Sequence, residues 1–271
     1  MITDLDHVVL AVRDFGAAVA GYEALLGREA RRTEPAGGAV RAWFRLANVA
    51  LEIIAPTGEG VAGDRVRERL DAHGEGPSML AFAVDDLDDA GRRLGRRGLT
   101  INPVRGTDFQ ALAAAPETTC GLPMVFARFE TFPPAPLLGD SAGAIDAIDH
   151  VVIMTPHPER AAALYGARLG LDLRLDRTQS WGARQLFFRC GGVIVEVVHP
   201  TKAGVSDGPD SFGGFAWRTA DAGAAHARLS AAGFSVSEPR PGRKPGTRVF
   251  TIKDRTFGAP TIVMDAEPAK V

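Results

Sequence analysis

Two kinds of apolar pattern alternate along the chain, and they follow the same order in each half. Short runs of β-branched and aromatic residues predict strands, whereas apolar residues that recur every three or four positions predict amphipathic helices. A glycine directly after a helical stretch is a common helix end, and Gly27 has this position. The first predicted elements are a strand at 5–12, a helix at 15–26 and strands near 28–34, 39–46 and 49–55. This order is a β-α-β-β-β module.

The same order of elements is predicted three more times. A short surface helix at 61–73 precedes the second module, and a loop rich in Gly, Ser and Asp at 201–211 precedes the fourth. The four modules cover residues 1–56, 78–130, 147–200 and 212–265. Strands and helices mixed in this way predict an α+β fold made of tandem β-α-β-β-β units.

An internal repeat supports this division. The stretch LDHVV that begins at Leu5 recurs as IDHVV from Ile148, so the two histidines are offset by 150−7 = 143 residues. The glutamates of the fourth predicted strands are offset by 196−52 = 144 residues. Self-similarity over such a period predicts two domains of two modules each, at 1–130 and 145–271. The segment 131–144, which begins with a proline-rich run, is predicted to be the linker.

Composition narrows the classes of partner. The 271 residues are 45% hydrophobic with a formal net charge of −2, which gives no reason to expect nucleic acid or an anionic membrane surface. Cys120 and Cys190 stand at unrelated positions and form neither a disulfide framework nor a zinc motif, so we expect a reducing, cytoplasmic location. The acidic start of the chain is unlike a signal peptide. The expected partner is a small molecule, and the sequence leaves a homodimer open.

The repeated histidine and glutamate are the main candidates for chemistry. His150 and Glu196 in the second half, like His7 and Glu52 in the first, lie within otherwise apolar strands. A carboxylate inside an apolar barrel is costly unless it is paired, protonated or bound to a metal. All four residues are therefore candidate metal ligands, and Glu196 is the candidate catalytic carboxylate. A buried hydrogen-bonded couple without metal is the open alternative.

Further residues of the second half could line a substrate pocket. The aromatic candidates are Trp181, Phe212 and Trp217, for which ordinary core packing is an equal alternative. Arg248 heads a predicted strand and is a candidate clamp for an anionic substrate, although a solvated turn explains its basic surroundings as well. The first half lacks these aromatic and basic residues, so we predict that the better-formed cavity lies in the second half.

Four such modules, with a histidine early in the first strand and a glutamate in the fourth, resemble the vicinal oxygen chelate superfamily. Its members include glyoxalase I, methylmalonyl-CoA epimerase, bleomycin resistance proteins and extradiol dioxygenases. The resemblance implies half-open barrels around a divalent metal such as Fe, Mn, Zn or Ni, and no organic cofactor. Two positions depart from it: Met79 and Phe212 stand where the second and fourth modules of the family often carry a histidine.

Two functions follow from this resemblance. The first is an enzyme that acts on a small molecule with vicinal oxygens, as an isomerase, lyase or epimerase assisted by a divalent metal. Ring-cleaving dioxygenation is less favoured, because the fourth module lacks the ligands that it normally supplies. The alternative is a metal-free protein of the bleomycin-resistance type, which binds and sequesters a small molecule.

Overall fold

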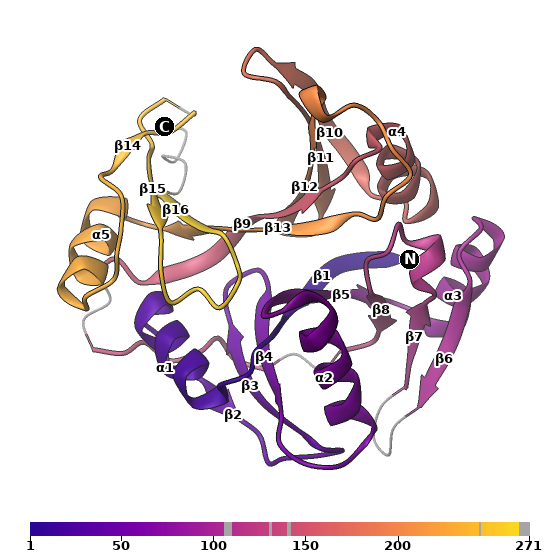
Figure 1. Cartoon of the computed structure of the whole chain (residues 1–271), viewed down its shortest axis with the longest axis horizontal. Helices are drawn as coiled ribbons and strands as arrows, with labels where there is room; N and C mark the ends of the chain where they lie inside the picture. Colours follow the sequence, from indigo (N-terminus) through magenta and orange to yellow (C-terminus); the bar gives the residue numbers. More distant parts are fainter. Residues whose placement is uncertain (106–109, 130–131, 140–141, 244, 266–271) are drawn as a thin grey trace. The chain divides into compact units, whose positions relative to one another are not determined.

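The computed structural model describes residues 1–105, 110–129, 132–139, 142–243 and 245–265. These residues form two eight-stranded mixed sheets with helices, and neither sheet is closed (Figure 1). The fold class predicted from the sequence, tandem α+β modules forming half-open barrels, is thereby confirmed. Among the described residues, every helix is too short or too polar to cross a bilayer.

The first sheet has the strand order β2-β3-β4-β1-β5-β8-β7-β6. Its strands are β1 (Ile2–Ala11), β2 (Arg31–Arg32), β3 (Ala39–Arg45), β4 (Ala50–Pro56), β5 (Gly76–Val84), β6 (Ile101–Arg105), β7 (Gln110–Ala114) and β8 (Met124–Ala127). The helices of this half are α1 (Phe15–Leu26), α2 (Val61–His73) and α3 (Leu87–Arg96), with a short 3-10 turn η1 (Pro116–Thr118). The strand predicted at 28–34 contracts to two residues, since both residues of β2 are exposed.

The second sheet repeats this order as β10-β11-β12-β9-β13-β16-β15-β14. Its strands are β9 (Ile145–Met154), β10 (Asp172–Gln179), β11 (Ala183–Cys190), β12 (Val193–Pro200), β13 (Ser211–Thr219), β14 (Arg240–Pro241), β15 (Arg248–Ile252) and β16 (Thr261–Asp265). Its helical segments are α4 (Pro158–Ala162), η2 (Ala163–Arg168), η3 (Thr201–Ala203) and α5 (Ala222–Ala231). The helix of the third module is therefore α4 followed by a wider turn of π type, η2.

Aspartate side chains cap the beginnings of three helices, and a glycine ends the first of them. Asp14 caps α1 by accepting from the amide of Ala17 at 2.9 Å, and Gly27 ends the helix with a φ of 66°. Asp86 and Asp221 cap α3 and α5 in the same way. These caps satisfy amides that have no partner within the helix, so the aspartates define where the helices begin.

By internal packing, the described residues divide into two compact units. The first unit contains Met1–Val8, Ser78–Thr131 and His150–Gly213. The second contains Val9–Pro77, Phe132–Asp149 and Gly214–Val271. Each unit therefore draws on both halves of the sequence.

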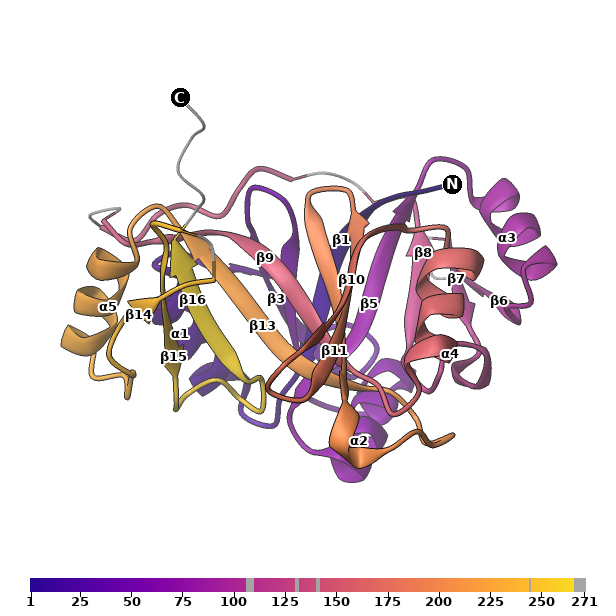
Figure 2. The same ribbon diagram turned by 90° about the horizontal axis from the view of Figure 1, so that it is seen from above.

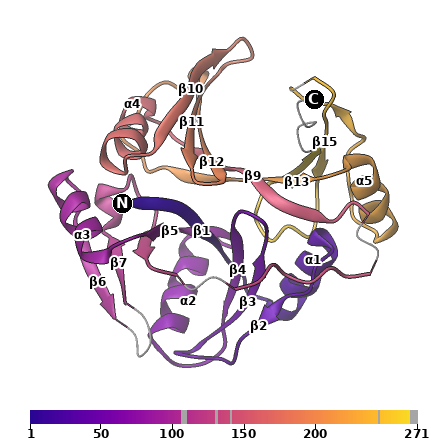
Figure 3. The ribbon, with the colours of Figure 1, turned by 180° about the vertical axis from the view of Figure 1, so that it is seen from behind.

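The core of the first unit lies between the sheet and its helices. Val195 and Val197 of β12 and Phe188 of β11 are buried and face α4 and η2, where Tyr165 packs on Phe188 with ring centroids 5.6 Å apart (Figure 3). The segment before β13 is held to the loop before β8, because the amide of Asp210 donates to the carbonyl of Cys120 at 2.7 Å.

The core of the second unit is built around aromatic side chains. Tyr22 of α1 and Trp217 of β13 are completely buried, with ring centroids 6.4 Å apart. The Tyr22 hydroxyl donates to the carbonyl of Thr256 at 3.2 Å. Helix α5 packs along β15 and β16 in the same unit (Figure 2). Residues from the beginning and end of the chain thus share one core.

Candidate functional site

His150 and Glu196 lie on the same face of the sheet in the first unit. β9 and β12 run parallel, with His150 beside Ile194 and Val152 beside Glu196. Residues two apart on a strand share a face, so both side chains point away from the face that packs on α4 and η2. His199 lies an odd number of positions from Glu196 and therefore on the opposite face, where its Nδ1 is 3.1 Å from the carbonyl oxygen of Thr155.

The two side chains are in direct contact. Nε2 of His150 is 3.0 Å from Oε2 of Glu196, and the side chains are only 15% and 8% exposed. The Gln185 amide on β11 donates to the other carboxylate oxygen, Oε1. A buried carboxylate needs such donors, because water no longer solvates it. The first and fourth strands of the module thus place a histidine and a glutamate in contact.

The hydrogen-bond chain continues to the edge of the sheet. Gln185 accepts at its Oε1 from the amide of Gln179 on β10 at 2.6 Å. Turned over, the Gln179 amide instead accepts from Nε of Arg177 at 2.7 Å and from its Nη2 at 3.2 Å, and it then no longer donates to Gln185. The contacts of Glu196 with His150 and Gln185 span three adjacent strands on one face, and they hold the carboxylate in place in either orientation of Gln179.

The residues as placed do not form a three-ligand metal site. A catalytic divalent ion takes three or more protein ligands and an open position. Among the described residues, no group of three or more His, Cys, Asp and Glu side chains could hold an ion. His150 and Glu196 supply two donors, and these are bonded to each other. No catalytic step is therefore assigned to a metal.

The residues predicted to line a substrate pocket lie in different environments. Trp217 is completely buried in the core of the second unit, beside Tyr22 and Phe215. Arg248 is exposed and pairs with Asp221 at 2.9 Å and with Asp265 at 3.2 Å.

The other two aromatic candidates belong to the first unit. Trp181 lies in the turn between β10 and β11 and is 57% exposed, and Phe212 lies half-buried near the start of β13. A substrate-binding role for Trp181, Phe212, Trp217 and Arg248 stays a prediction.

The first half carries the same two residue types, and each has a further partner of its own. Nδ1 of His7 is 2.8 Å from Oδ2 of Asp6, and its ring meets Phe129 edge to face with centroids 5.1 Å apart. Oε1 of Glu52 is 3.0 Å from Nε of Arg41, in a pair whose side chains are 7% and 27% exposed. Metal binding by His7 and Glu52 also stays a prediction.

The partner of the glutamate is what distinguishes the two halves. With the offset of 144, Arg41 corresponds to Gln185, so the first half has a guanidinium where the second has a neutral amide. A guanidinium forms a strong charge-assisted pair with a carboxylate and cannot give up its proton. Glu52 is thus held in an ion pair with a permanent cation, whereas Glu196 has a neutral amide and a titratable imidazole as partners. The second half therefore has the arrangement suited to proton transfer.

Sequence reasoning missed Gln185, Gln179 and Arg177. One signal was available: strands at 182–190 and 193–199 joined by a tight turn place Gln185 opposite Val198, on the same face as Glu196. A glutamine in an otherwise apolar strand, pointing to the face of a buried glutamate, is a candidate partner.

The family model for the glyoxalase/bleomycin resistance protein/dioxygenase superfamily matches residues 6–111 and 149–251. The chain belongs to this superfamily. The two matched regions correspond to the two halves recognised from the repeat. The superfamily assignment made from the sequence is thus confirmed.

A named relative and two solved structures add detail. The ethylmalonyl-CoA/methylmalonyl-CoA epimerase of Cereibacter sphaeroides is 34% identical over 103 residues, which are 37% of this chain and 75% of the relative. A mutant of 4-hydroxymandelate synthase from Streptomyces coelicolor has a TM-score of 0.73 at 16% identity, covering 100% of this chain and 94% of the other. The Mn(II)-bound glyoxalase from Novosphingobium aromaticivorans has a TM-score of 0.68 at 16% identity, and the match covers 97% of this chain and 82% of the other. At these identities the two structures establish the fold.

Proposed function

We propose that this superfamily member catalyses proton transfer at a carbon next to a carbonyl group, in an epimerase or isomerase type of reaction. The observation that carries the proposal is the contact between His150 and Glu196, backed by the neutral Gln185, on the face of the sheet turned away from α4 and η2. The equivalent glutamate of the first half, Glu52, is paired with Arg41.

In this reaction the Glu196 carboxylate is the proton carrier. Oε2 takes the proton from the substrate carbon, and the electron pair of the broken C–H bond moves to the carbonyl oxygen as an enolate. For the isomer, Glu196 returns this proton to a neighbouring atom; for the epimer, water protonates the opposite face of the carbon and Glu196 releases its proton to solvent. Gln185 and His150 hold the carboxylate in place, since each occupies one of its oxygens.

Arg177 supports an inference about the substrate class. It lies on β10 opposite Gln185, hence on the face of Glu196, and its guanidinium is 5.4 Å from the centre of the Phe187 ring. In the described part of the chain, Arg177 has no carboxylate partner. With Nε and Nη2 turned towards the Gln179 amide, the stacked guanidinium keeps Nη1 for an anionic group such as a carboxylate. The proposed substrate is therefore a small acyl compound that carries a carboxylate.

The named relative is consistent with this class. Ethylmalonyl and methylmalonyl groups each carry a carboxylate and an acidic C–H between two carbonyl carbons. The other solved relatives support the fold and say nothing about the substrate. We accordingly choose methylmalonyl-CoA as the first compound to test.

The test is exchange of the substrate proton with solvent. The chain is incubated with methylmalonyl-CoA in D₂O, and loss of the C2 proton signal is followed by NMR, with EDTA and with added Mn²⁺ in separate arms. We expect exchange in the unmodified chain and a loss of about 10²–10⁴-fold in Glu196→Gln, the usual contribution of a general base. Glu159→Gln is the matched control, because Glu159 is exposed and pairs with Arg184.

Each outcome separates the proposal from its alternative. Exchange that depends on Glu196 and persists in EDTA supports proton transfer by the protein groups. Exchange only with added Mn²⁺ would show that the protein groups alone are insufficient. Binding of the compound without exchange in any arm would instead favour the sequestering function.

A further inference from the structure

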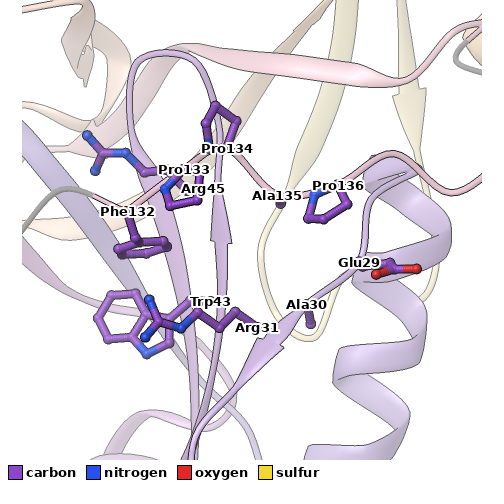
Figure 4. A pocket seen from close by; sticks show the side chains of 10 residues that line it. All are labelled: Glu29, Ala30, Arg31, Trp43, Arg45, Phe132, Pro133, Pro134, Ala135 and Pro136. Atoms are coloured by element: carbon purple, nitrogen blue, oxygen red, sulfur yellow. The ribbon is translucent and has the colours of Figure 1, made fainter.

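The second unit contains a pocket remote in sequence from the pair just described. The pocket has a volume of about 500 Å³ and lies between the β2–β3 edge and the segment Phe132–Pro136. Its lining residues are Glu29, Ala30, Arg31, Trp43, Arg45, Phe132, Pro133, Pro134, Ala135 and Pro136 (Figure 4). This volume is within the range of about 300–1,000 Å³ that is usual for small-molecule sites.

The wall formed by Phe132–Pro136 is fixed by backbone hydrogen bonds. The amide of Ala135 donates to the carbonyl of Arg45 at 2.7 Å, and the amide of Glu29 donates to the carbonyl of Pro136 at 2.8 Å. Nη1 of Arg28 donates to the carbonyl of Ala135 at 2.8 Å. The prolines in this segment also have restricted backbones. Little conformational entropy is therefore lost when a ligand packs against the wall.

Aromatic rings and guanidinium groups gather on one side of the pocket. Phe132 and Trp43 meet edge to face with centroids 6.0 Å apart. The guanidinium of Arg31 is 5.2 Å from the Phe132 ring centre, and that of Arg45 is 6.0 Å from it. Glu29 lies on the other side (Figure 4).

Arg31 has the geometry of an anion-binding residue. Among the described residues it makes no ion pair, and its guanidinium stacks on the Phe132 ring. A stacked guanidinium retains the N–H edge that binds a carboxylate or phosphate in a bidentate manner. Its neighbour Arg32 lies opposite Ala42, hence on the other face of the strand, and its Nη2 is 3.6 Å from Oε2 of Glu23.

We propose that this pocket binds a planar aromatic ring that carries an anionic group, either a carboxylate or a phosphate. The ring packs against Phe132, Trp43 and the prolines, and the anion binds Arg31. This site is separate from the proposed proton-transfer pair, and its occupation does not require His150 or Glu196.

The test is direct binding to the full chain, measured by calorimetry and by Trp43 fluorescence. Benzoate and adenosine 5′-monophosphate are the two ring anions, and they distinguish a carboxylate from a phosphate. Cyclohexanecarboxylate lacks the aromatic face, and inorganic phosphate lacks the ring. We expect at least one ring anion to bind and to bind about tenfold more tightly than both controls.

Variants connect the binding to named residues. Arg31→Ala should weaken binding by about tenfold or more, the value of a charge-assisted hydrogen bond, whereas Arg32→Ala should change it less than about twofold. Glu29→Gln should strengthen binding, because an opposing charge is removed. Arg31→Lys keeps the charge but lacks the planar fork, so it should bind more weakly than the unmodified chain.

The proposal is overturned if neither ring anion binds, if the controls bind equally well, or if Arg31→Ala and Arg32→Ala behave alike. Equal melting temperatures for the Arg31 variants exclude unfolding as the cause of a loss. His150→Ala should retain this binding, so the outcome is independent of the proposed enzymatic function.

Discussion

Replacing His150 by alanine tests whether the contact with Glu196 contributes to folding. The substitution removes the Nε2 donor that is 3.0 Å from a carboxylate only 8% exposed. Glu196 then keeps the Gln185 amide as its described side-chain donor. A hydrogen bond to a charged group is worth about 1.5–3 kcal/mol, so the free energy of unfolding should fall by about that amount. For a chain of this size, the melting temperature should fall by roughly 3–10 °C.

The interaction is isolated by a double-mutant cycle. The four proteins are the unmodified chain, His150→Ala, Glu196→Gln and the double variant, and each is unfolded in urea with circular dichroism as the readout. If the two side chains interact, the double variant loses less stability than the two single variants together. We expect a coupling free energy of about 1–2 kcal/mol, within the usual range for residues in contact.

A coupling free energy below about 0.5 kcal/mol would refute the reasoning, since this is the value found for residues that do not touch. The slope of the urea transition must stay unchanged for the comparison to hold, because a changed slope reports a different unfolded or native state.

Three further predictions follow from other contacts. Arg41→Gln should lower the free energy of unfolding by about 2–3 kcal/mol in urea titrations, because the buried Glu52 loses its cation; unchanged stability would show that the pair is not a stabilising one. Burial raises the pKa of the Asp210 carboxyl above its ordinary value, so the folded chain holds the carboxyl proton more tightly than the unfolded chain does. The free energy of unfolding should therefore fall as the pH rises from the pKa of Asp210 in the unfolded chain to its pKa in the folded chain. Asp210→Asn should flatten the pH dependence of the melting temperature in that interval, and an unaltered slope would contradict it. In α2, a Cβ at Gly63 would lie 2.1 Å from the carbonyl oxygen of Gly38, so Gly63→Ala should lower the free energy of unfolding by about 2 kcal/mol or more. In α3, a Cβ at Gly95 would meet no atom within 4 Å, so Gly95→Ala should raise it by about 0.5–1 kcal/mol. Equal melting temperatures for the two variants would contradict this difference in packing.

The sequence was sufficient for the fold and for the central pair because both depend on local periodicity. Alternation with a period of two fixes which face of a strand a side chain occupies, and the repeat provides two copies in which His and Glu keep their positions. The contact between His150 and Glu196 follows once β9 and β12 are adjacent. The position of Gly27 at the end of α1 was also evident, since a left-handed residue there favours glycine.

The rest depends on contacts between distant segments, which periodicity does not encode. Trp217 was a candidate for a substrate pocket as an aromatic residue of the second half, with core packing as the alternative, and in the structure it packs on Tyr22 from the other half of the sequence. Gln185 resembles any polar residue on a half-buried strand until its cross-strand neighbours are known. The pocket beside Arg31 is closed by Phe132, which lies 101 residues further along the chain (132−31 = 101).

The composition of the two compact units also bears on how the chain folds as it is synthesised. The second unit includes Val9–Pro77 but requires Gly214–Val271, and the Tyr22 hydroxyl bonds to a residue 234 positions later. The first unit likewise needs residues up to Gly213. Contacts at such sequence separation form slowly, since a long loop must close before they are gained. We therefore expect that neither unit completes its core until most of the chain has left the ribosome, and that the first β-α-β-β-β module emerges with an apolar surface that must wait for its partner.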